Sequence, residues 1–382
     1  MQPKSATIKN SVTVIQLASG DLWAGAEVQL FTLSKSLQRH PQVNLHVILL
    51  NKGKLEAELK KQRISTYVYD ESRLSSIQIF KKLSALCKQL RPDILHTHRQ
   101  KENVIGSLAC LFSDSCRSLR TIHGSNEHTL TLKSVIQNAL DIFCGNFLQK
   151  RVVSVTNELT GKLKSIYPLK VVTIPNGVDI DSIKAASQAP SMLKSNDEEL
   201  SVGFFGRLVP VKRVDLIIDI AEALVARAKN VHFYIAGTGP EEDKIRSLII
   251  NRDLSEHITL LSHLDNPYPI LKQMDCVLLT SDHEGSPMIL LEALSLGTYI
   301  IAHNTGEIGN YLSQPTLGQA IDSQNPTDYS KALESLIEEK QSRDRKAGPK
   351  YIIEKYSNEI MANKYLSTYL DICKHKPKLG TH

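Results

Sequence analysis

Two carboxylates at a fixed spacing are the side chains of this chain best placed to do chemistry. Seven residues separate Glu284 from Glu292, and the first of these seven are Gly285, Ser286 and Pro287. A glycine allows a sharp turn, a serine can cap a helix, and a proline suits the first helical position because its missing N–H would have had no partner. This pattern predicts a turn that contains Glu284 and a helix that carries Glu292 about two turns further along.

The elements around this pair predict a binding site for an anion. The apolar run 277–280 precedes the turn and is typical of a buried strand, and Gly297 is placed to end the helix. The backbone N–H groups of Met288 and Ile289 would then face the carboxyl edge of a parallel sheet, where anions bind. We therefore expect the two carboxylates to hold hydroxyl groups at the two ends of one extended phosphorylated ligand.

Four further motifs follow one another along the chain. They combine small residues with charged ones at short spacing: Ala24-Gly25-Ala26-Glu27, Asn176-Gly177-Val178-Asp179, Gly206-Arg207-Leu208 with Lys212-Arg213, and Ala236-Gly237-Thr238-Gly239-Pro240. Together with the Glu-x7-Glu element, this order resembles the retaining family 4 glycosyltransferases (glycosyltransferase group 1), and the resemblance covers nearly the whole chain. It implies the α/β architecture called GT-B, in which two doubly wound Rossmann-like domains face each other across a cleft.

The resemblance implies that the second domain binds a nucleoside-diphosphate sugar. It assigns Glu292 to the donor ribose and Glu284 to the transferred sugar. It assigns Arg207 and Lys212 to the diphosphate, where two cations would neutralise the leaving group. The other donor-binding positions that it implies are Gly25, Gly206, Gly237, Gly239, Ser262, His263, Leu264, Gly285, Ser286, Pro287, Met288 and Ile289. Since two cations would do the work of a divalent metal, we expect catalysis with no metal and no cofactor besides the donor substrate.

Three residues of the first half are candidates for the acceptor side of the site. The resemblance places His123 near the donor sugar and the acceptor, in a hydrogen-bonding or polar role rather than as general base. His98 matches a family pattern more weakly. Trp23 is a candidate platform for the acceptor, and a packed tryptophan is the equal alternative.

Size and composition are those of two ordinary globular domains. The chain has 382 residues, of which 41% are hydrophobic and 23% are charged. No run approaches the roughly 20 apolar residues of a membrane helix, and residues 1–5 lead into no signal-peptide core, so a cytoplasmic location is expected. The six cysteines form no Cys-x2-Cys pair and are interpreted as reduced thiols. Oligomeric state stays open.

Charge is divided unevenly between the two halves. Residues 1–180 hold 24 Lys and Arg against 13 Asp and Glu, a net +11, and residues 181–382 hold 22 against 27, a net −5. The basic half favours an anionic partner, either a pyrophosphate-linked acceptor or an anionic membrane surface, to which the protein would attach peripherally on the inner face of the cytoplasmic membrane. A well-solvated basic face is the alternative. Aromatic residues make up only 5%, which disfavours nucleic acid as partner.

Strand-like runs alternate with helical stretches along the chain, which predicts parallel sheets with helices on both faces. The expected strands are 12–17, 43–50, 64–69, 94–96, 119–122, 152–155, 171–174, 201–205, 231–235, 258–261, 277–280 and 299–301. The expected helices include 27–39, 77–90, 132–148, 213–226 and 358–373.

The polar segment 184–199 is the best linker candidate. We therefore predict an acceptor-binding domain over 1–183, a nucleotide-sugar domain over 200–357, and a tail over 358–382. The resemblance implies that the helix of this tail crosses back onto the first domain.

The predicted function is transfer of a sugar, with retention, from a nucleoside-diphosphate sugar to a lipid-linked or glycan acceptor of a bacterial surface polysaccharide. A UDP-sugar is the first expectation for the donor and GDP-mannose the second. Two alternatives stay open. One is another GT-B enzyme, such as a sugar-nucleotide epimerase or a sucrose or sugar-phosphate synthase. The other is a non-catalytic protein that binds a sugar nucleotide.

Overall fold

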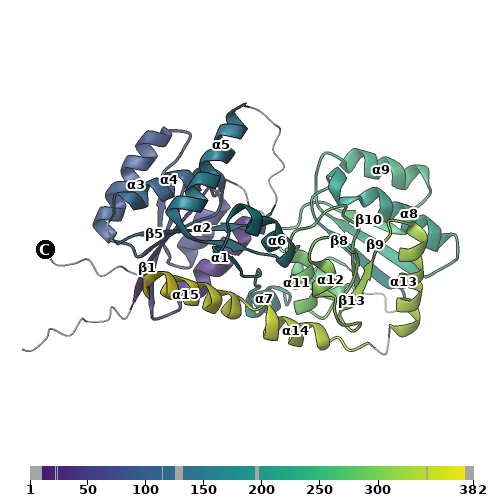
Figure 1. Cartoon of the computed structure of the whole chain (residues 1–382). Coiled ribbons are helices and arrows are strands. Elements are labelled where there is room, and N and C mark those ends of the chain that lie inside the picture. The colour runs from purple at the N-terminus through teal and green to yellow at the C-terminus, as the bar shows by residue number, and fades with distance from the viewer. Residues whose placement is uncertain are drawn as a thin grey trace, which may run out of the picture. The chain divides into compact units, whose positions relative to one another are not determined.

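The computed structural model of the chain divides into two compact units (Figure 1). The first consists of residues 1–177 and 358–382, and the second of residues 178–357. The structure describes residues 11–21, 23, 25–113, 115–124, 132–193, 198–340 and 343–374. Ala24 of the first predicted glycine motif, part of the predicted linker (194–197) and the end of the tail (375–382) lie outside the described residues.

The first unit is built on a seven-stranded parallel sheet with the order β3-β2-β1-β4-β5-β6-β7. Its strands are β1 Val12–Ala18, β2 Val43–Leu49, β3 Ser65–Val68, β4 Ile94–Thr97, β5 Arg117–Ile122, β6 Gln149–Ser154 and β7 Val171–Thr173. Its helices are α1 Gly25–Gln38, α2 Lys54–Lys61, α3 Ser76–Leu90, α4 Gln100–Leu111, α5 Leu132–Phe143 with a π-helical turn over Cys144–Leu148, α6 Asn157–Ile166 and α15 Asn358–Lys374.

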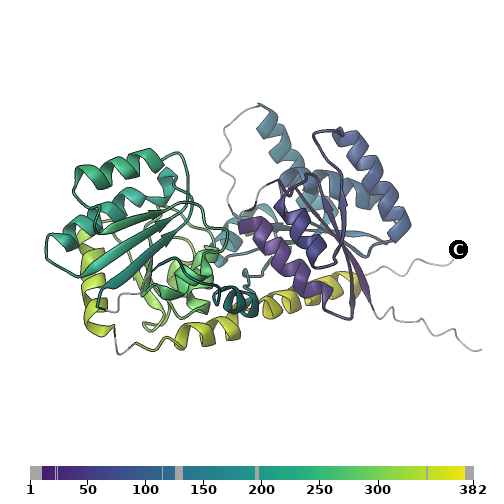
Figure 2. The same ribbon diagram turned by 180° about the vertical axis from the view of Figure 1, so that it is seen from behind.

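Helices cover both faces of this sheet (Figures 1 and 2). Buried residues such as Leu33 of α1, Leu59 of α2 and Tyr369 of α15 pack against one face. Ile79 of α3 and Ile105 of α4 pack against the other, and α5 lies against α4. The chain therefore returns at its end to complete a core layer that it began at α1.

The second unit has a six-stranded parallel sheet with the order β10-β9-β8-β11-β12-β13. Its strands are β8 Leu200–Phe205, β9 Val231–Ala236, β10 Ile258–Leu261, β11 Cys276–Leu279, β12 Tyr299–His303 and β13 Gly318–Ile321. Its helices are α7 Ile180–Ala186, α8 Val214–Val225, α9 Glu242–Asn251, α10 Tyr268–Gln273, α11 Met288–Ser295, α12 Ile308–Tyr311, α13 Pro326–Glu339 and α14 Ala347–Lys355, with a 3-10 turn over Pro210–Lys212. Helices α8, α9 and α13 form one core layer and α7, α10, α11 and α14 the other.

The predicted strands are confirmed, with ends shifted by a few residues, and so is the prediction of two Rossmann-like domains. Strand β13 was missed, because its sequence Gly-Gln-Ala-Ile has only one β-branched residue. The predicted helix over 132–148 ends earlier: α5 stops at Phe143 and a π-helical turn follows.

The division between the units falls earlier than the predicted linker. Val178, Ile180 and Ile183 are buried in the core of the second unit, and Leu193 packs against that core. Residues 184–193 thus belong to the second unit, although their polar composition is typical of a linker. The tail helix α15 belongs to the first unit.

None of the helices in the described part of the chain is both long enough and apolar enough to cross a membrane.

Candidate functional site

Each sheet has one point where the strand order reverses, and the predicted site residues follow the strands at these points. In the first unit the reversal lies between β1 and β4, and in the second it lies between β8 and β11. Ligands of open α/β sheets bind at the carboxyl edge of such switch points. Arg207 and Lys212 follow β8, Glu284 follows β11, and His98 follows β4.

The loop after β8 carries three cations that differ in their surroundings. The Arg207 side chain is exposed, and no hydrogen bond or ion pair joins it to another residue of the described ranges. Lys212 ends the 3-10 turn, and its Nζ lies 2.5 Å from Oε1 of Glu284. Arg213 bonds the carboxylate of Asp215 at 3.2 Å and lies 3.4 Å from Asp282. Arg207 is thus open to an anionic ligand, whereas Arg213 holds the loop in place.

Glu284 is a buried carboxylate fixed by two neighbours. Its Oε1 accepts hydrogen bonds from Lys212 Nζ and from Ser281 Oγ, the latter at 2.7 Å. The hydroxyl of Thr280 donates to the backbone oxygens of Lys212 and Arg213, both at 2.9 Å, so the end of β11 also holds the cationic loop. Since an ammonium has three donors, Lys212 can keep this ion pair and still contact a diphosphate.

The glycines of the loop after β9 allow two backbone segments to touch. A Cβ atom on Gly237 would lie 1.8 Å from the carbonyl oxygen of Gly206, and one on Gly239 would lie 2.2 Å from that of Leu208. Gly237 also has a φ of +144°, a conformation that side chains disfavour. The 206–208 loop therefore packs directly against the glycine motif. This packing is by itself a sufficient reason for glycine at positions 237 and 239.

A pocket forms where these loops meet in the second unit. Five predicted donor-binding residues line it: Gly206, Arg207, Gly237, His263 and Leu264. Ser262 is exposed beside them, and its carbonyl oxygen accepts a hydrogen bond from Gly237 N–H at 3.1 Å.

The start of α11 differs from the prediction at one residue. Pro287 is the residue that precedes the helix, and Ser286 does not cap it, because the Ser286 hydroxyl bonds the hydroxyl of Tyr311 at 2.7 Å. Met288 and Ile289 are half-buried in the first turn, where backbone N–H groups have no acceptor within the helix. Gly297 has a φ of +80° just beyond the end of the helix, as predicted.

Glu292 lies within α11 and faces a tyrosine. The Tyr268 hydroxyl donates to Glu292 Oε1 at 3.4 Å. Burial raises the pKa of Glu292 to about 7, because the charged form loses hydration. Tyr268 was not found from the sequence, since nothing in the run Asn-Pro-Tyr-Pro at 266–269 links it to a helix 20 residues away.

The two predicted histidines of the first unit contact each other. His98 Nδ1 lies 3.1 Å from His123 Nε2, and the two rings stack. Behind them, the buried His96 bonds the hydroxyls of Tyr369 and Thr121, each at 2.8 Å. Burial lowers the pKa of His123 to about 4, so this ring is neutral at pH 7. A neutral His123 fits the predicted role in hydrogen bonding.

Trp23 and Gly25 stand at the start of α1. The Trp23 ring packs 5.9 Å from the Phe31 ring, and the ammonium of Lys54 lies 5.5 Å from its centroid. These contacts match the alternative of a packed tryptophan, although the side chain stays partly exposed. Gly25 is exposed with no atom near the position of a Cβ, so the surrounding protein does not demand a glycine there.

One Asp-x-Asp sequence occurs in the chain, at Asp179-Ile180-Asp181. Asp179 caps α7, because its carboxylate accepts from the backbone N–H of Ser182 at 3.1 Å and from the Ser182 hydroxyl at 2.9 Å. The expectation of metal-free catalysis therefore rests on Arg207 and Lys212.

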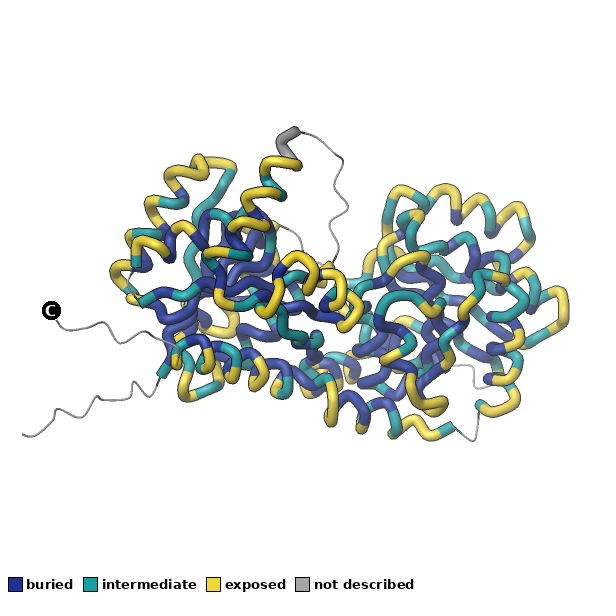
Figure 3. The backbone as a smooth tube through the Cα atoms, viewed as in Figure 1, coloured by how far each residue is buried: buried dark blue, intermediate teal, exposed yellow. Residues whose placement is uncertain are grey.

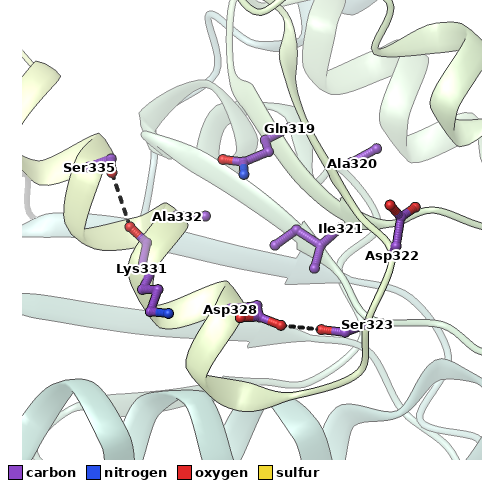
Figure 4. A pocket seen from close by; sticks show the side chains of 9 residues that line it. All are labelled: Gln319, Ala320, Ile321, Asp322, Ser323, Asp328, Lys331, Ala332 and Ser335. Atoms are coloured by element: carbon purple, nitrogen blue, oxygen red, sulfur yellow. Dashed lines mark hydrogen bonds between the residues drawn. The ribbon is translucent and has the colours of Figure 1, made fainter.

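A second hollow of the second unit lies between β13 and α13 (Figure 4). Its polar groups bond locally: Ser323 donates to Asp328, and Ser335 donates to the carbonyl oxygen of Lys331 at 3.2 Å. No predicted site residue lines it.

Comparison with known families and proteins agrees with this arrangement. The model described as Glycosyltransferase Family 4 matches residues 23–182, and the model described as Glycosyl transferases group 1 matches residues 188–350. The poly(ribitol-phosphate) alpha-N-acetylglucosaminyltransferase of Staphylococcus aureus (strain COL) is 27% identical over 232 residues, which cover 58% of this chain and 46% of that protein. This chain therefore aligns with less than half of that relative.

Two other similarities extend further along the chain. The UDP-Gal:alpha-D-GlcNAc-diphosphoundecaprenol alpha-1,3-galactosyltransferase of Escherichia coli is 26% identical over 309 residues, or 73% of this chain and 79% of that protein. The crystal structure of Anabaena Alr3699/HepE in complex with UDP superposes with a TM-score of 0.81 at 17% identity, covering 94% of this chain and all of that one. The latter similarity is evidence for the fold.

Proposed function

We propose that this chain, which belongs to the family 4 glycosyltransferases of the GT-B fold, transfers a sugar from a nucleoside-diphosphate sugar to a lipid-linked or glycan acceptor. The observation that carries the proposal is the placement of Arg207, Lys212 and Glu284 at the switch point of the second sheet. The Lys212 ammonium pairs there with the buried Glu284 carboxylate. The exposed Arg207 lines a pocket together with Gly206 and Gly237. Cations suit the diphosphate, and carboxylates suit sugar hydroxyls.

The proposed donor is a UDP-sugar, with GDP-mannose as the second choice. One relative is named for UDP-Gal, and HepE was crystallised with UDP, which supports uridine. In this assignment Glu292 accepts hydrogen bonds from the ribose, and Glu284 accepts them from the transferred sugar.

The proposed reaction is substitution with retention. The bond between the anomeric carbon and the diphosphate oxygen breaks, and the acceptor oxygen bonds that carbon on the same face. The acceptor proton passes to an oxygen of the departing diphosphate. Arg207, Lys212 and the N-terminus of α11 stabilise the growing negative charge without a metal.

The proposed acceptor belongs to the assembly of a bacterial surface polysaccharide. The names of the relatives include a capsular polysaccharide glycosyltransferase and a transferase to a diphosphoundecaprenol-linked sugar. These names support a lipid-linked or glycan acceptor.

Two measurements test the donor and the reaction. A thermal-shift screen should show a rise in melting temperature with UDP or UDP-sugars, because a ligand of the folded state stabilises it by mass action. Once an acceptor is found, the anomeric configuration of the product can be assigned from its anomeric proton coupling in NMR. It should be the same as the configuration of the donor. An inverted product would refute retention, and a screen in which no nucleotide shifts the melting temperature would refute the donor assignment.

We further propose that the first unit attaches peripherally to an anionic membrane through α5 and the turn after it. The described part of α5 is coloured largely as exposed in Figure 3. The large apolar side chains that are exposed along this segment are Val135, Ile136, Leu140, Ile142, Phe143 and Phe147. The chain from 132 to 170 holds six Lys and Arg against two Asp and Glu. Exposed apolar residues beside an excess of cations are typical of helices that lie in the interface of anionic lipids.

Co-sedimentation with vesicles of rising anionic lipid content tests this attachment. Phe143→Asp should reduce binding several-fold, and rising salt should reduce it further. The matched control is Ile250→Asp, because Ile250 is similarly exposed on α9 of the second unit. Equal binding of the parent and Phe143→Asp would refute the attachment surface.

A further inference from the structure

A further pocket lies in the first unit, at the switch point between β1 and β4. Its lining comes from the segments after β1, β4 and β5 and from α5, and it includes Ser19, Asp21, His98, Glu102, His123 and Gln137. This edge of an open α/β sheet is where ligands bind.

Three buried polar atoms on residues that line this pocket have no hydrogen-bond partner within the described residues. They are Nε2 of His98, Oε2 of Glu102 and Nε of Arg120, whose guanidinium is already paired with Asp141. His98 is 6% exposed and Glu102 is 1% exposed, so water does not readily serve them. Buried polar groups are normally hydrogen-bonded, so polar atoms without partners that gather in one pocket indicate a ligand that supplies the missing hydrogen bonds. The contact of His98 Nδ1 with His123 fixes the orientation of the His98 ring, and its Nε2 stays available to a ligand.

The cations of the pocket are already neutralised. Each Lys or Arg that lines it has a carboxylate partner from the same unit: Arg99 pairs with Asp21 and Glu27, Lys101 with Glu71, and Arg120 with Asp141. A phosphate group would therefore have to compete with these carboxylates and would meet Glu102 as well.

We infer that this pocket binds the uncharged sugar ring of the acceptor, with one hydroxyl on His98 Nε2 and another on Glu102 Oε2, and that it does not bind the acceptor's phosphate groups. The inference rests on the proposed function, because it names the part of the acceptor that the first unit recognises. A hydroxyl both donates and accepts, so it satisfies either tautomer of His98 and either protonation state of Glu102.

The protonation of the two groups agrees with a neutral ligand. Burial lowers the pKa of His98 well below its usual value, so this ring is uncharged at pH 7. Burial raises the pKa of Glu102 to about 7, although the cations Arg99 and Arg120 oppose the shift. The pocket can thus present two neutral polar groups where a phosphate would require positive charge.

Saturation-transfer NMR on the full chain tests the inference with methyl glycosides of glucose, galactose, mannose and N-acetylglucosamine as probes. At least one glycoside should receive saturation from the parent protein. His98→Ala and Glu102→Leu should each lower that signal at least fivefold, whereas Glu102→Gln, which keeps a neutral polar group, should restore most of it. The matched control is Glu158→Leu, the same change at an exposed position of α6, and it should bind like the parent.

UDP affinity, measured by calorimetry on the same variants, separates this inference from the donor assignment. It should be unchanged in all of them, and thermal unfolding curves equal to the parent's show that both units are folded. Failure of every glycoside to bind a parent that binds UDP would overturn the sugar pocket and leave the donor assignment standing. Full glycoside binding by Glu102→Leu, or displacement of the glycoside by inorganic pyrophosphate, would also overturn it. A parent that binds a glycoside but not UDP would overturn the donor assignment instead.

Discussion

The switch points of the two sheets differ in the state of their cations. In the first unit, Arg99 and Lys101 are both held by carboxylates of their own unit. In the second, Arg207 is exposed without such a partner in the described part of the chain. Lys212 forms an ion pair with Glu284, whose carboxylate also accepts a hydrogen bond from Ser281. The same topology therefore offers neutral hydrogen-bonding groups at one sheet and uncompensated positive charge at the other. That difference suits a sugar acceptor in the first case and a diphosphate in the second.

The comparison also shows that the net charge of a half does not predict the charge of its site. The half with a net +11 contains the pocket whose cations are neutralised, and the half with a net −5 contains the exposed Arg207. Pairing within a few ångströms determines what a ligand meets, whereas distant surface charges are screened. The excess of cations in the first half therefore lies outside this pocket.

The largest expected effect follows from removing the uncompensated charge. Arg207→Ala should lower kcat by on the order of 10²-fold, as loss of a group that stabilises transition-state charge does elsewhere. Its matched control is Arg213→Ala, which removes a paired cation of the same loop. The control should lower the melting temperature and change kcat only a few-fold. Equal losses of kcat in steady-state assays of the two variants would contradict the distinction between open and paired cations.

A smaller effect is expected from removing the carboxylate that is proposed to bind the donor ribose. Glu292→Ala should weaken UDP binding by about 1.5–3 kcal/mol, the usual value of a hydrogen bond to a charged group. Calorimetry should show this loss for UDP as well as for UDP-sugars, because the ribose is common to both. Unchanged affinity would remove Glu292 from the site.

The pH dependence of donor binding should reveal the same carboxylate. Since burial raises the pKa of Glu292 to about 7, the charged form that accepts from the ribose is lost as pH falls below 7. Affinity for a UDP-sugar should then fall by up to about tenfold per pH unit. In the free protein the sign is opposite: the charge is costly when buried, so this group's contribution to stability is lost as pH rises through 7. Glu292→Gln should abolish the first dependence in calorimetric titrations and remove this group's share of the second in thermal titrations, where Glu102, with a pKa of about 7, still contributes.

The smallest effect is expected at the Asp-x-Asp sequence. Asp179→Ala removes a helix cap and should cost about 1 kcal/mol of unfolding free energy, measured by urea titration. Activity in EDTA should be equal in variant and parent. Loss of a manganese-dependent activity in the variant alone would show that Asp179 is a metal ligand and would contradict metal-free catalysis.

Periodicity was sufficient to predict most strands and the parallel sheets with helices on both faces, because buried parallel strands are continuous apolar runs. The two Rossmann-like domains were implied by the family resemblance. Periodicity could not predict the contacts between segments that lie far apart in the sequence. Nothing in the sequence Gln-Lys-Glu-Asn at 100–103 distinguishes the buried Glu102 from a solvated residue of a helix start. The available signal was its position just after a predicted strand, since ligands bind at the carboxyl ends of the strands of a parallel sheet. The hydrogen bond of Ser286 to Tyr311 was equally hidden, since the two lie 25 residues apart.

Helix α15 makes the first unit a discontinuous domain, with consequences for how the protein is made on the ribosome. The hydroxyls of Tyr369 and Tyr365 reach His96 and Thr121, beneath the His98–His123 pair. The nascent sheet must therefore wait while the whole second unit is translated, about 10–40 s at usual elongation rates. The part of this sheet face that α15 covers stays exposed during that time, and chaperones are expected to bind it. A message broken before codon 358 would yield a complete second unit attached to a first unit that cannot finish folding.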